Sequence, residues 1–286
     1  MYPAQFEYHK AGTVKEAVDL LAQYKDEAKL LAGGHSLLPA MKLRLAQPKH
    51  LIDIGKVSGL AGVKEEGGTL VIGAMTTHYA IESSALLKGK CPLLPEVAGH
   101  IGDPMVRNMG TLGGSLAHAD PAADWPAAVI ALGAELVAEG PKGKRTIKVD
   151  DFFKGLLTTA LAENEILTEI RVPACGANVK CAYAKFPHPA SRFAVVGVAA
   201  VLTMDGGKIS KASIGITGAG TKATRAKGVE AAIAGKPADA ASIQAAAEKA
   251  AEGVDVQADL QGSVEYKQHL LRVFAKRAME AAAAKK

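Results

Sequence analysis

In the first 56 positions, segments with apolar residues at helical spacing alternate with short apolar runs typical of strands, and this pattern predicts a small α/β unit. Thr13-Val-Lys-Glu16 is a capping-box pattern, and apolar residues then recur at helical spacing, which predicts a helix over 14–24. A short apolar run at 29–32 predicts a strand, and helical spacing returns from 37 to 44. The run at 50–54 predicts a second strand.

The middle of the chain alternates between the same two patterns. One helix is expected from the Thr76-Thr77 pair to about residue 87, a second ends near His100, and a third covers 121–132. The chain over 101–120 is expected to be irregular. Strands are predicted at 69–74, 135–138, 145–149 and 165–172. The strands at 135–138 and 145–149 are expected to form a hairpin.

The last part of the chain predicts an antiparallel meander followed by helices. Its expected strands are 182–186, 193–204 and 208–217, and its expected helices are 239–252 and 263–284. We therefore predict an α+β fold of three subdomains: two small α/β subdomains and a C-terminal antiparallel sheet covered by helices. Their expected bounds are 1–56, 57–176 and 177–286.

Composition narrows the class of protein. The 286 residues are 49% hydrophobic and 22% charged, with a net charge of +5 and dispersed basic residues, which argues against nucleic-acid binding. No apolar run approaches the roughly 20 residues of a membrane span, and the start lacks a signal-peptide pattern. We therefore expect a cytoplasmic location, with any membrane association only peripheral. The three cysteines are too few for a disulfide framework or an iron–sulfur site and are expected to be reduced thiols.

Two glycine-rich segments stand out as candidate anion sites. The first is Ala32-Gly33-Gly34-His35-Ser36-Leu37, and the second is Gly110-Thr111-Leu-Gly113-Gly114-Ser115. Glycines let the backbone approach a ligand closely, and the hydroxyls stand beside amides that can bind phosphate oxygens. Each segment alone could be an ordinary tight turn. As a pair they favour a diphosphate, and hence a dinucleotide, gripped from both sides.

Other polar residues have both an ordinary and a functional interpretation. Asp120 and Asp124 can cap a helix, or Asp124 can accept a hydrogen bond from a ribityl or ribose hydroxyl. His35 and His118 flank the glycine segments without further ligands nearby, so no metal site is expected. Lys185 and Phe193 are either ordinary strand ends or approach a cofactor at a domain junction. No residue is expected to act as a catalytic acid, base or nucleophile.

These motifs resemble the FAD-binding medium subunit of molybdenum hydroxylases, a family that includes carbon monoxide dehydrogenase and xanthine dehydrogenase-type enzymes. The resemblance rests on Ala32-Gly-Gly-His-Ser36 with Leu-Leu-Pro-Ala-Met-Lys after it, and on Ile101-Gly-Asp-Pro-Met-Val-Arg-Asn-Met-Gly-Thr-Leu-Gly-Gly-Ser115. It extends through Ala117-His-Ala-Asp-Pro-Ala-Ala-Asp124, Glu165 to Pro173 and Tyr266. It therefore covers nearly the whole chain.

The resemblance implies that FAD is bound noncovalently between the first two subdomains, which clamp it. The two glycine segments would hold the diphosphate, Asp124 a ribityl hydroxyl, and Leu167 would lie near the adenine. The family also implies a large subunit with molybdopterin and a small subunit with two [2Fe-2S] clusters, in a dimer of heterotrimers. Electrons would pass from the clusters through this flavin to an external acceptor.

One departure and two alternatives remain open at this point. Many relatives have an Asp-Tyr pair where this chain has Arg192-Phe193, so the acceptor and the flavin potential are not fixed by the resemblance. A self-sufficient flavin oxidase with FAD linked covalently through His35 is the first alternative. A flavin-free interaction domain is the second.

Overall fold

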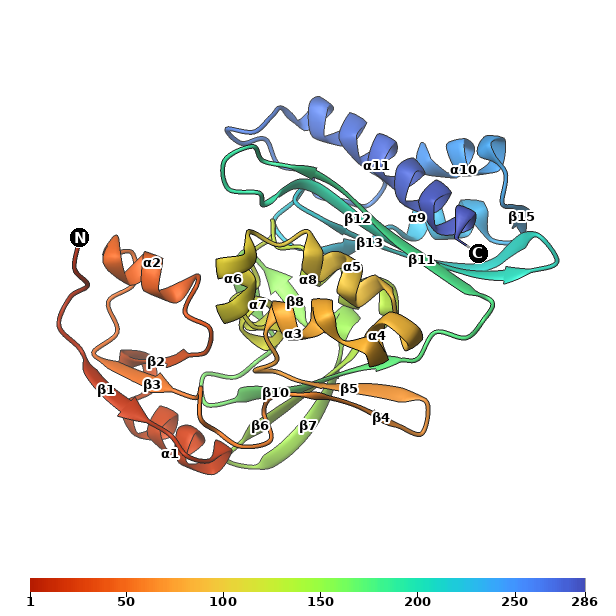
Figure 1. The fold of residues 1–286 in the computed structure, drawn as a ribbon. Helices are drawn as coiled ribbons and strands as arrows, with labels where there is room; N and C mark the ends of the chain where they lie inside the picture. The colour runs from red at the N-terminus through yellow and green to blue at the C-terminus, as the bar shows by residue number, and fades with distance from the viewer. Residues whose placement is uncertain (286) are drawn as a thin grey trace.

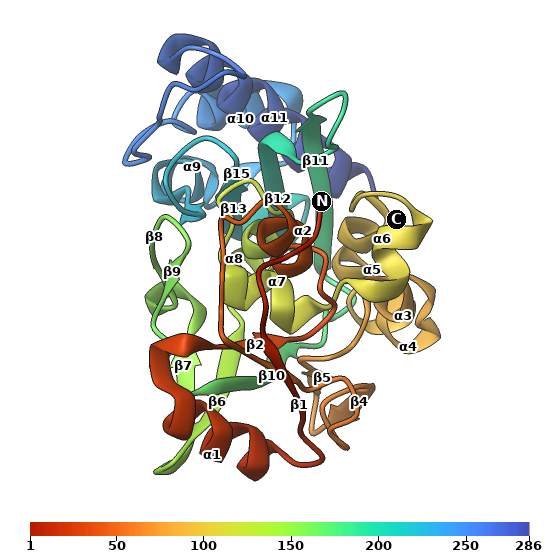
Figure 2. The ribbon, with the colours of Figure 1, turned by 90° about the vertical axis from the view of Figure 1, so that its left-hand side faces the viewer.

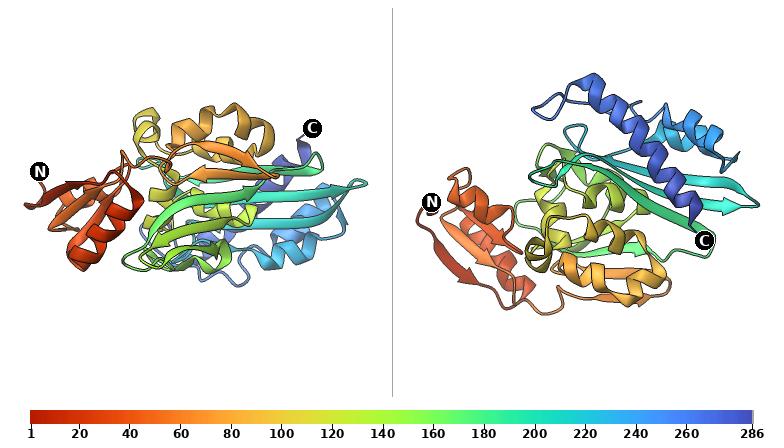
Figure 3. Two further views of the ribbon diagram at one scale, coloured as in Figure 1. Left: turned by 90° about the horizontal axis from the view of Figure 1, so that it is seen from below. Right: turned by 45° about the horizontal axis from the view of Figure 1, so that its top comes forward.

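The computed structural model describes residues 1–285, and each predicted subdomain range contains one main sheet. Figure 1 shows the N-terminal sheet at one end of the molecule, the second sheet and its helices in the middle, and the C-terminal sheet with its helices at the other end. The two further views in Figure 3 keep this arrangement, with the N-terminal part set apart. The α+β class is confirmed, whereas the exact subdomain boundaries stay a prediction.

The first sheet has three parallel strands in the order β1-β3-β2, joined by helices. Its elements are β1 (Glu7–Lys10), α1 (Val14–Tyr24), η1 (Lys25–Glu27), β2 (Ala28–Leu31), α2 (Leu37–Lys42) and β3 (His50–Asp53). Helix α1 has the predicted bounds, because the Thr13 hydroxyl caps the Glu16 amide and the Glu16 carboxylate accepts from the Gly12 amide. The apolar face of α1 packs on this sheet through Ala17, Val18 and Leu21.

The second sheet is antiparallel, with strand order β4-β5-β10-β6-β7. Its strands are β4 (Val63–Glu66), β5 (Thr69–Gly73), β6 (Glu135–Gly140), β7 (Gly143–Lys148) and β10 (Ile166–Pro173). The predicted 135–149 hairpin is thus confirmed. A short helix η2 (Val149–Asp151) and a small pair, β8 (Phe153–Gly155) and β9 (Thr158–Thr159), follow the hairpin.

The helices of the second subdomain correct two predictions. They are α3 (His78–Ser83), α4 (Ala85–Lys90), α5 (Leu93–Gly99), α6 (Pro104–Met109), α7 (Leu112–His118) and α8 (Trp125–Leu132). The single helix expected up to residue 87 is wrong, because Ser84 interrupts it and caps the next helix through the Leu87 amide. The irregular chain expected over 101–120 is also wrong, because Asp103 and Thr111 each cap a helix there.

The third subdomain is an antiparallel sheet with helices over one face, as predicted. Its elements are β11 (Val179–Pro187), β12 (Ala194–Asp205), β13 (Lys208–Thr217), β14 (Thr224–Arg225), α9 (Lys227–Ile233), β15 (Lys236–Pro237), α10 (Ala240–Ala247) and α11 (Val264–Ala284). The three helices share one hydrophobic core with this sheet. Figure 2 shows α10 and α11 beyond the sheet, on the side away from the N-terminal strands.

Helix α8 lies between the second and third sheets and is buried along its whole length. The third sheet packs on its backbone so closely that a Cβ atom on Gly215 would lie 2.0 Å from the Ala127 carbonyl oxygen. The chain just before α8 is held by the same sheet. The Thr217 hydroxyl contacts the carbonyl oxygens of Pro121 and Ala123 at 2.7 Å each, and the Ala194 amide donates to Ala122.

Candidate functional site: a cleft between two glycine segments

A cavity of about 630 Å³ opens where the three subdomains meet, with both glycine segments in its wall. A volume of this size is typical of a site for a small molecule or cofactor. All predicted site residues except Lys185 line it, and these are Ala32, Gly33, Gly34, His35, Ser36, Leu37, Gly110, Thr111, Gly113, Gly114, Ser115, Asp124, Leu167 and Phe193. The fold therefore brings together positions that are up to 161 residues apart, because strand ends and helix starts from three subdomains converge on the cavity.

The two glycine segments are in direct contact. A Cβ atom on Gly33 would lie 2.1 Å from the carbonyl oxygen of Met109 and 2.8 Å from the Cα atom of Gly110. A Cβ atom on Gly114 would lie 3.4 Å from that of Ala32. Only a residue without a side chain lets the backbones approach this closely, so Gly33 fixes the distance between the first and second subdomains at this point.

The first segment carries the free backbone donors. It follows β2 directly, and the amides of residues 33–37 have no hydrogen-bond acceptor among residues 1–285. Gly34 has a φ of +75°, a conformation that favours glycine, and the Ser36 hydroxyl makes no capping bond to α2. Consecutive unpaired amides of this kind can bind an anion.

The backbone amides of the second glycine segment are already hydrogen-bonded within the protein, contrary to the expectation. The amides of residues 112–115 donate in turn to Thr76, Ala74, Thr111 Oγ1 and the Thr111 carbonyl oxygen, so they are not free for a ligand. The expectation of exposed amides is thus wrong for these residues, because they form the capped first turn of α7 rather than an open loop. What this segment adds to the cavity is the Ser115 side chain and a glycine surface.

His78 supports the second segment from behind. Its Nδ1 atom accepts a hydrogen bond from Trp125 Nε1 at 3.0 Å, and its Nε2 atom lies so close to Gly110 that a Cβ atom there would be 2.6 Å away. Burial lowers the pKa of His78 to about 4, and the nearby His35 and Arg107 act in the same direction. The imidazole is therefore neutral at physiological pH.

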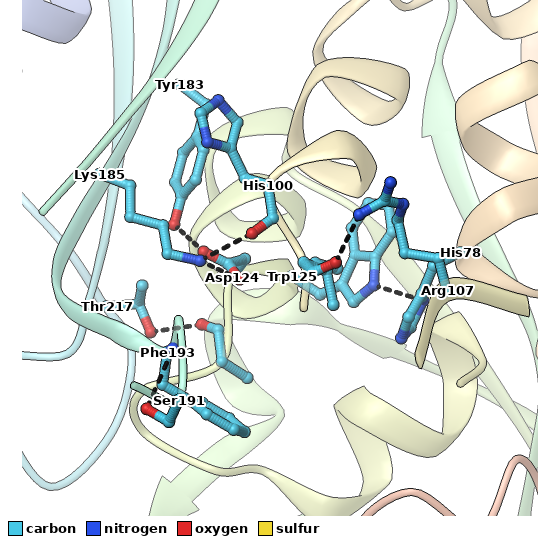
Figure 4. A network of polar contacts seen from close by, with 12 residues as sticks. His78, His100, Arg107, Asp124, Trp125, Tyr183, Lys185, Ser191, Phe193 and Thr217 are labelled. Atoms are coloured by element: carbon cyan, nitrogen blue, oxygen red, sulfur yellow. Dashed lines mark hydrogen bonds and ion pairs between the residues drawn. The ribbon is translucent and has the colours of Figure 1, made fainter. Parts of the chain in front are cut away.

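Asp124 lies at the centre of a buried polar network (Figure 4). Its Oδ1 atom accepts from the Tyr183 hydroxyl at 2.5 Å, and its Oδ2 atom accepts from Lys185 Nζ at 2.9 Å. Burial raises the pKa of Asp124, while the positive charge of Lys185 and the Tyr183 hydrogen bond oppose this shift. Lys185 also donates to the His100 carbonyl oxygen, and it lies behind Asp124 rather than at the cavity wall. Its position does not support a direct contact with a cofactor.

Phe193 reaches the cavity from the tight loop between β11 and β12. The loop is closed by the hydrogen bonds from His188 N to Phe193 O and from Arg192 N to His188 O, and Arg192 has a φ of +60°. The Phe193 side chain is 44% exposed and lines the cavity, as does Arg192. The third subdomain thus contributes an aromatic side chain to the cavity wall, whereas its approach to a cofactor stays a prediction.

Sequence reasoning missed two participants. His78 and Tyr183 are buried partners of site residues, yet neither belongs to a glycine segment. His78 follows the Thr76-Thr77 pair, where the sequence indicated only a helix start, and Tyr183 reads as one more apolar residue of a strand. Cys91 and Cys181 lie in one hydrophobic core, and the partly buried Cys175 packs against it. Among the helices of the described chain, none is both long and apolar enough for a membrane span.

Comparison with known proteins gives the class. Residues 4–175 match the family described as "FAD binding domain in molybdopterin dehydrogenase", and residues 181–282 match "CO dehydrogenase flavoprotein C-terminal domain". Together with the cleft, these matches define a flavoprotein of the molybdopterin dehydrogenases. The chain belongs to the family of FAD-binding medium subunits of these oxidoreductases, and its cofactor is FAD.

Individual relatives agree along the whole length. The carbon monoxide dehydrogenase medium chain of Hydrogenophaga pseudoflava is 45% identical over 282 residues, which cover 99% of this chain and 98% of that one. The corresponding chain of Afipia carboxidovorans is 38% identical and covers 100% and 99%. A solved structure of carbon monoxide dehydrogenase from Hydrogenophaga pseudoflava matches with a TM-score of 0.97 and 48% identity over 99% of both chains. Quinoline 2-oxidoreductase from Pseudomonas putida 86 matches with a TM-score of 0.93 at 32% identity, covering 99% and 98%.

Proposed function

We propose that this chain is the electron-transfer subunit of a molybdenum hydroxylase complex. It would receive electrons from [2Fe-2S] clusters on a small partner subunit and pass them to an external acceptor, while a large partner subunit with molybdopterin oxidises the substrate. The main support is the cavity itself, because its wall combines unpaired backbone amides, a buried carboxylate and an aromatic side chain from three subdomains, a set that suits one elongated ligand. The medium-chain relatives named above support the division of labour among subunits.

The residues present fit FAD. The free amides of residues 33–37 and the hydroxyls of Ser36 and Ser115 would hold the diphosphate. Leu167, which is 5% exposed at the cavity wall, would lie against the adenine. The flavin supplies the redox chemistry when it is bound, so the protein's part is to bind it, orient it and tune its surroundings.

Asp124 would accept a hydrogen bond from a ribityl hydroxyl. Both of its oxygens already have a donor, but a carboxylate oxygen can accept more than one hydrogen bond. Tyr183 and Lys185 would hold the carboxylate in a fixed orientation for that contact. Phe193 would pack on the flavin without donating a hydrogen bond. Arg192 beside it would add positive charge near the flavin.

Flavin content tests this proposal. The purified chain, or the complex that contains it, should show flavin absorbance at about one FAD per chain, and FAD should be released on denaturation in acid or heat. A chain that is folded yet neither contains nor takes up FAD would contradict the proposal and favour the flavin-free interaction domain. Single-turnover reduction of the flavin by substrate in the complete complex would then test the electron path.

The same denaturation separates the oxidase alternative. His35 lines the cavity, and its Nδ1 atom lies 3.1 Å from the Gly33 carbonyl oxygen, so Nε2 is the ring nitrogen that is left for a covalent link. Flavin that stays with the chain after denaturation and disappears in His35→Ala would support a self-sufficient oxidase with a covalent flavin. Complete release of FAD would support the electron-transfer subunit.

The assembly is part of the proposal. We infer a heterotrimer with the large and small subunits, paired into a dimer of heterotrimers in the cytoplasm. Co-expression of the three chains followed by size-exclusion chromatography with light scattering tests this arrangement, since the mass distinguishes one heterotrimer from two.

A further inference from the structure

Two histidines and a glutamate lie together on the N-terminal sheet, outside the cavity wall. Glu7 and His9 are on β1, and His50 begins β3, the neighbouring parallel strand (Figure 1). Glu7 pairs with His50 in the register, and residues two apart on a strand share a face, so the pairing places all three side chains on one side of the sheet. Their ligand atoms all lie within 4.8 Å of one another.

We propose that Glu7, His9 and His50 form a binding site for Zn²⁺. The distances between the ligand atoms are 3.0 Å from His9 Nε2 to His50 Nδ1, 3.4 Å from His50 Nδ1 to Glu7 Oε2, and 3.9 Å from His9 Nε2 to Glu7 Oε2. In a tetrahedral zinc site with bonds of about 2.05 Å, the ligand atoms lie about 3.3 Å apart. The observed triangle therefore has the size of one face of such a tetrahedron.

The contact between the two imidazoles brings together two ring nitrogens that can share either a proton or a metal ion. Two ring nitrogens 3.0 Å apart cannot both present lone pairs to each other without repulsion, so either a proton or a cation lies between them. A metal replaces that proton when each ring keeps its hydrogen on the other nitrogen. Imidazole and carboxylate are ligands that zinc accepts, whereas Ca²⁺ and Mg²⁺ prefer a shell of oxygens.

The ligands are preorganised by their neighbours. The Tyr24 ring at the end of α1 stacks on His50 with ring centroids 3.7 Å apart and on His9 at 4.9 Å. The two imidazole side chains are only 13% and 21% exposed, whereas Glu7 is 72% exposed and can adjust to close the site. The fourth position would face solvent and take a water molecule. A bound ion would pin the edge strand β1 to β3.

The site is separate from the proposed cofactor cleft. His50 pairs with Ala28 at the start of β2, whereas the glycine segment follows the other end of that strand, at Leu31. The expectation of no metal site rested on His35 and His118, which have no further ligands nearby. Here the ligands come from a Glu-x-His spacing on one strand and a residue 41 positions away on the next.

Metal titration of the full-length, FAD-containing protein tests the proposal. After treatment with a chelator, we expect one Zn²⁺ per chain by isothermal titration calorimetry, with a Kd of about 1 μM or below. Co²⁺ as a spectroscopic probe should give visible ligand-field bands in the difference spectrum and no thiolate charge-transfer band. A thiolate band would place the metal at Cys91, Cys175 and Cys181 instead and would overturn the proposal.

Variants separate the site from incidental binding. His9→Asn and His50→Asn should each weaken Zn²⁺ binding by about 100-fold, and Glu7→Gln, an exposed position that does not threaten the fold, by about tenfold. His269→Gln, which removes an exposed histidine elsewhere, should leave binding unchanged. Wild-type binding weaker than about 100 μM, or equal binding in Glu7→Gln and wild type, would overturn the proposal. Neither outcome would affect the flavin assignment.

Discussion

The ammonium group of Lys185 lies 2.9 Å from Asp124 Oδ2, and both side chains are almost fully buried, with exposed fractions of 2% and 5%. The pair joins the third subdomain to the start of α8. A buried charge without its partner is costly, so neither member can be removed alone without consequence. This relationship leads to the first prediction.

Lys185→Met should destabilise the protein by about 3–5 kcal/mol at pH 8, because it leaves the Asp124 carboxylate buried and unpaired. Burial already raises the pKa of Asp124, and the loss of Lys185 raises it further. A group with a raised folded-state pKa favours folding at low pH and loses that contribution as the pH rises. The loss in Lys185→Met should therefore shrink toward acidic pH, which urea unfolding at several pH values measures.

The double variant Lys185→Met with Asp124→Asn is the control for this prediction. It removes both charges at similar volume and should recover more than half of the lost stability. If the double variant is no more stable than Lys185→Met, the Asp124 charge is not the cause of the loss.

Gly33→Ala should weaken FAD binding at least about tenfold, because its methyl group would overlap the Met109 carbonyl oxygen and force the two glycine segments apart. Fluorescence quenching during FAD titration of the deflavinated protein measures the affinity. Gly89→Ala is a matched control, since this helical glycine has nothing within 4 Å of an added Cβ atom. Wild-type affinity in Gly33→Ala would show that the contact does not position the cofactor.

His78 should make the protein less stable in mild acid. Its pKa is about 4 in the folded state because of burial, whereas an unfolded histidine titrates near 6.5. The unfolded state thus takes up the proton first, and stability that is fully present above pH 6.5 is lost as the pH falls toward 4, by at most about 3 kcal/mol. Chemical denaturation at pH 7 and pH 5 measures the slope.

A glutamine at position 78 removes this titration. His78→Gln should flatten the stability profile between pH 5 and 7, although it lowers stability at pH 7 through the lost Trp125 contact. His269→Gln, at an exposed position, should keep the wild-type slope. An unchanged slope in His78→Gln would assign the pH dependence to another group.

Phe193→Ala should lower the affinity for FAD by about tenfold, because the exposed ring supplies apolar contact area at the cavity and its removal costs on the order of 1.4 kcal/mol. Phe193→Tyr keeps the ring and should bind FAD as tightly as wild type. If both variants bind FAD like wild type, Phe193 does not touch the cofactor.

Periodicity was most informative where an element has one apolar face or a clear cap. Helix α1 and the β6–β7 hairpin could be predicted because Thr13 and the 140–143 turn mark their ends. The segment around Gly113 could not, since glycine in a helix goes against local propensity. It is helical because the Thr111 side chain caps its first turn, and it tolerates a glycine because Gly113 packs against Ala74, where a Cβ atom would lie 2.4 Å away, a contact visible only in three dimensions.

Some residues of the candidate site could likewise be predicted from the sequence, and others could not. The glycine segments and Asp124 carry their chemistry in their residue types, so a sequence reader can find them. His78 and Tyr183 act through a neighbour, and nothing in their local sequence points to Trp125 or Asp124. Edge strand β1 escaped prediction for a related reason, because four residues are stabilised as a strand only by pairing with β3.

The hydrogen bonds between the third sheet and residues 121–123 limit how far the chain could be shortened. Thr217 and Ala194 hold this stretch by hydrogen bonds, and α8, which follows it, packs against the same sheet. A fragment ending near residue 176 would keep both glycine segments and still leave α8 uncovered and Asp124 without its two donors. A minimal flavin carrier cut from this protein would therefore have to include the C-terminal sheet, even though that sheet holds neither glycine segment.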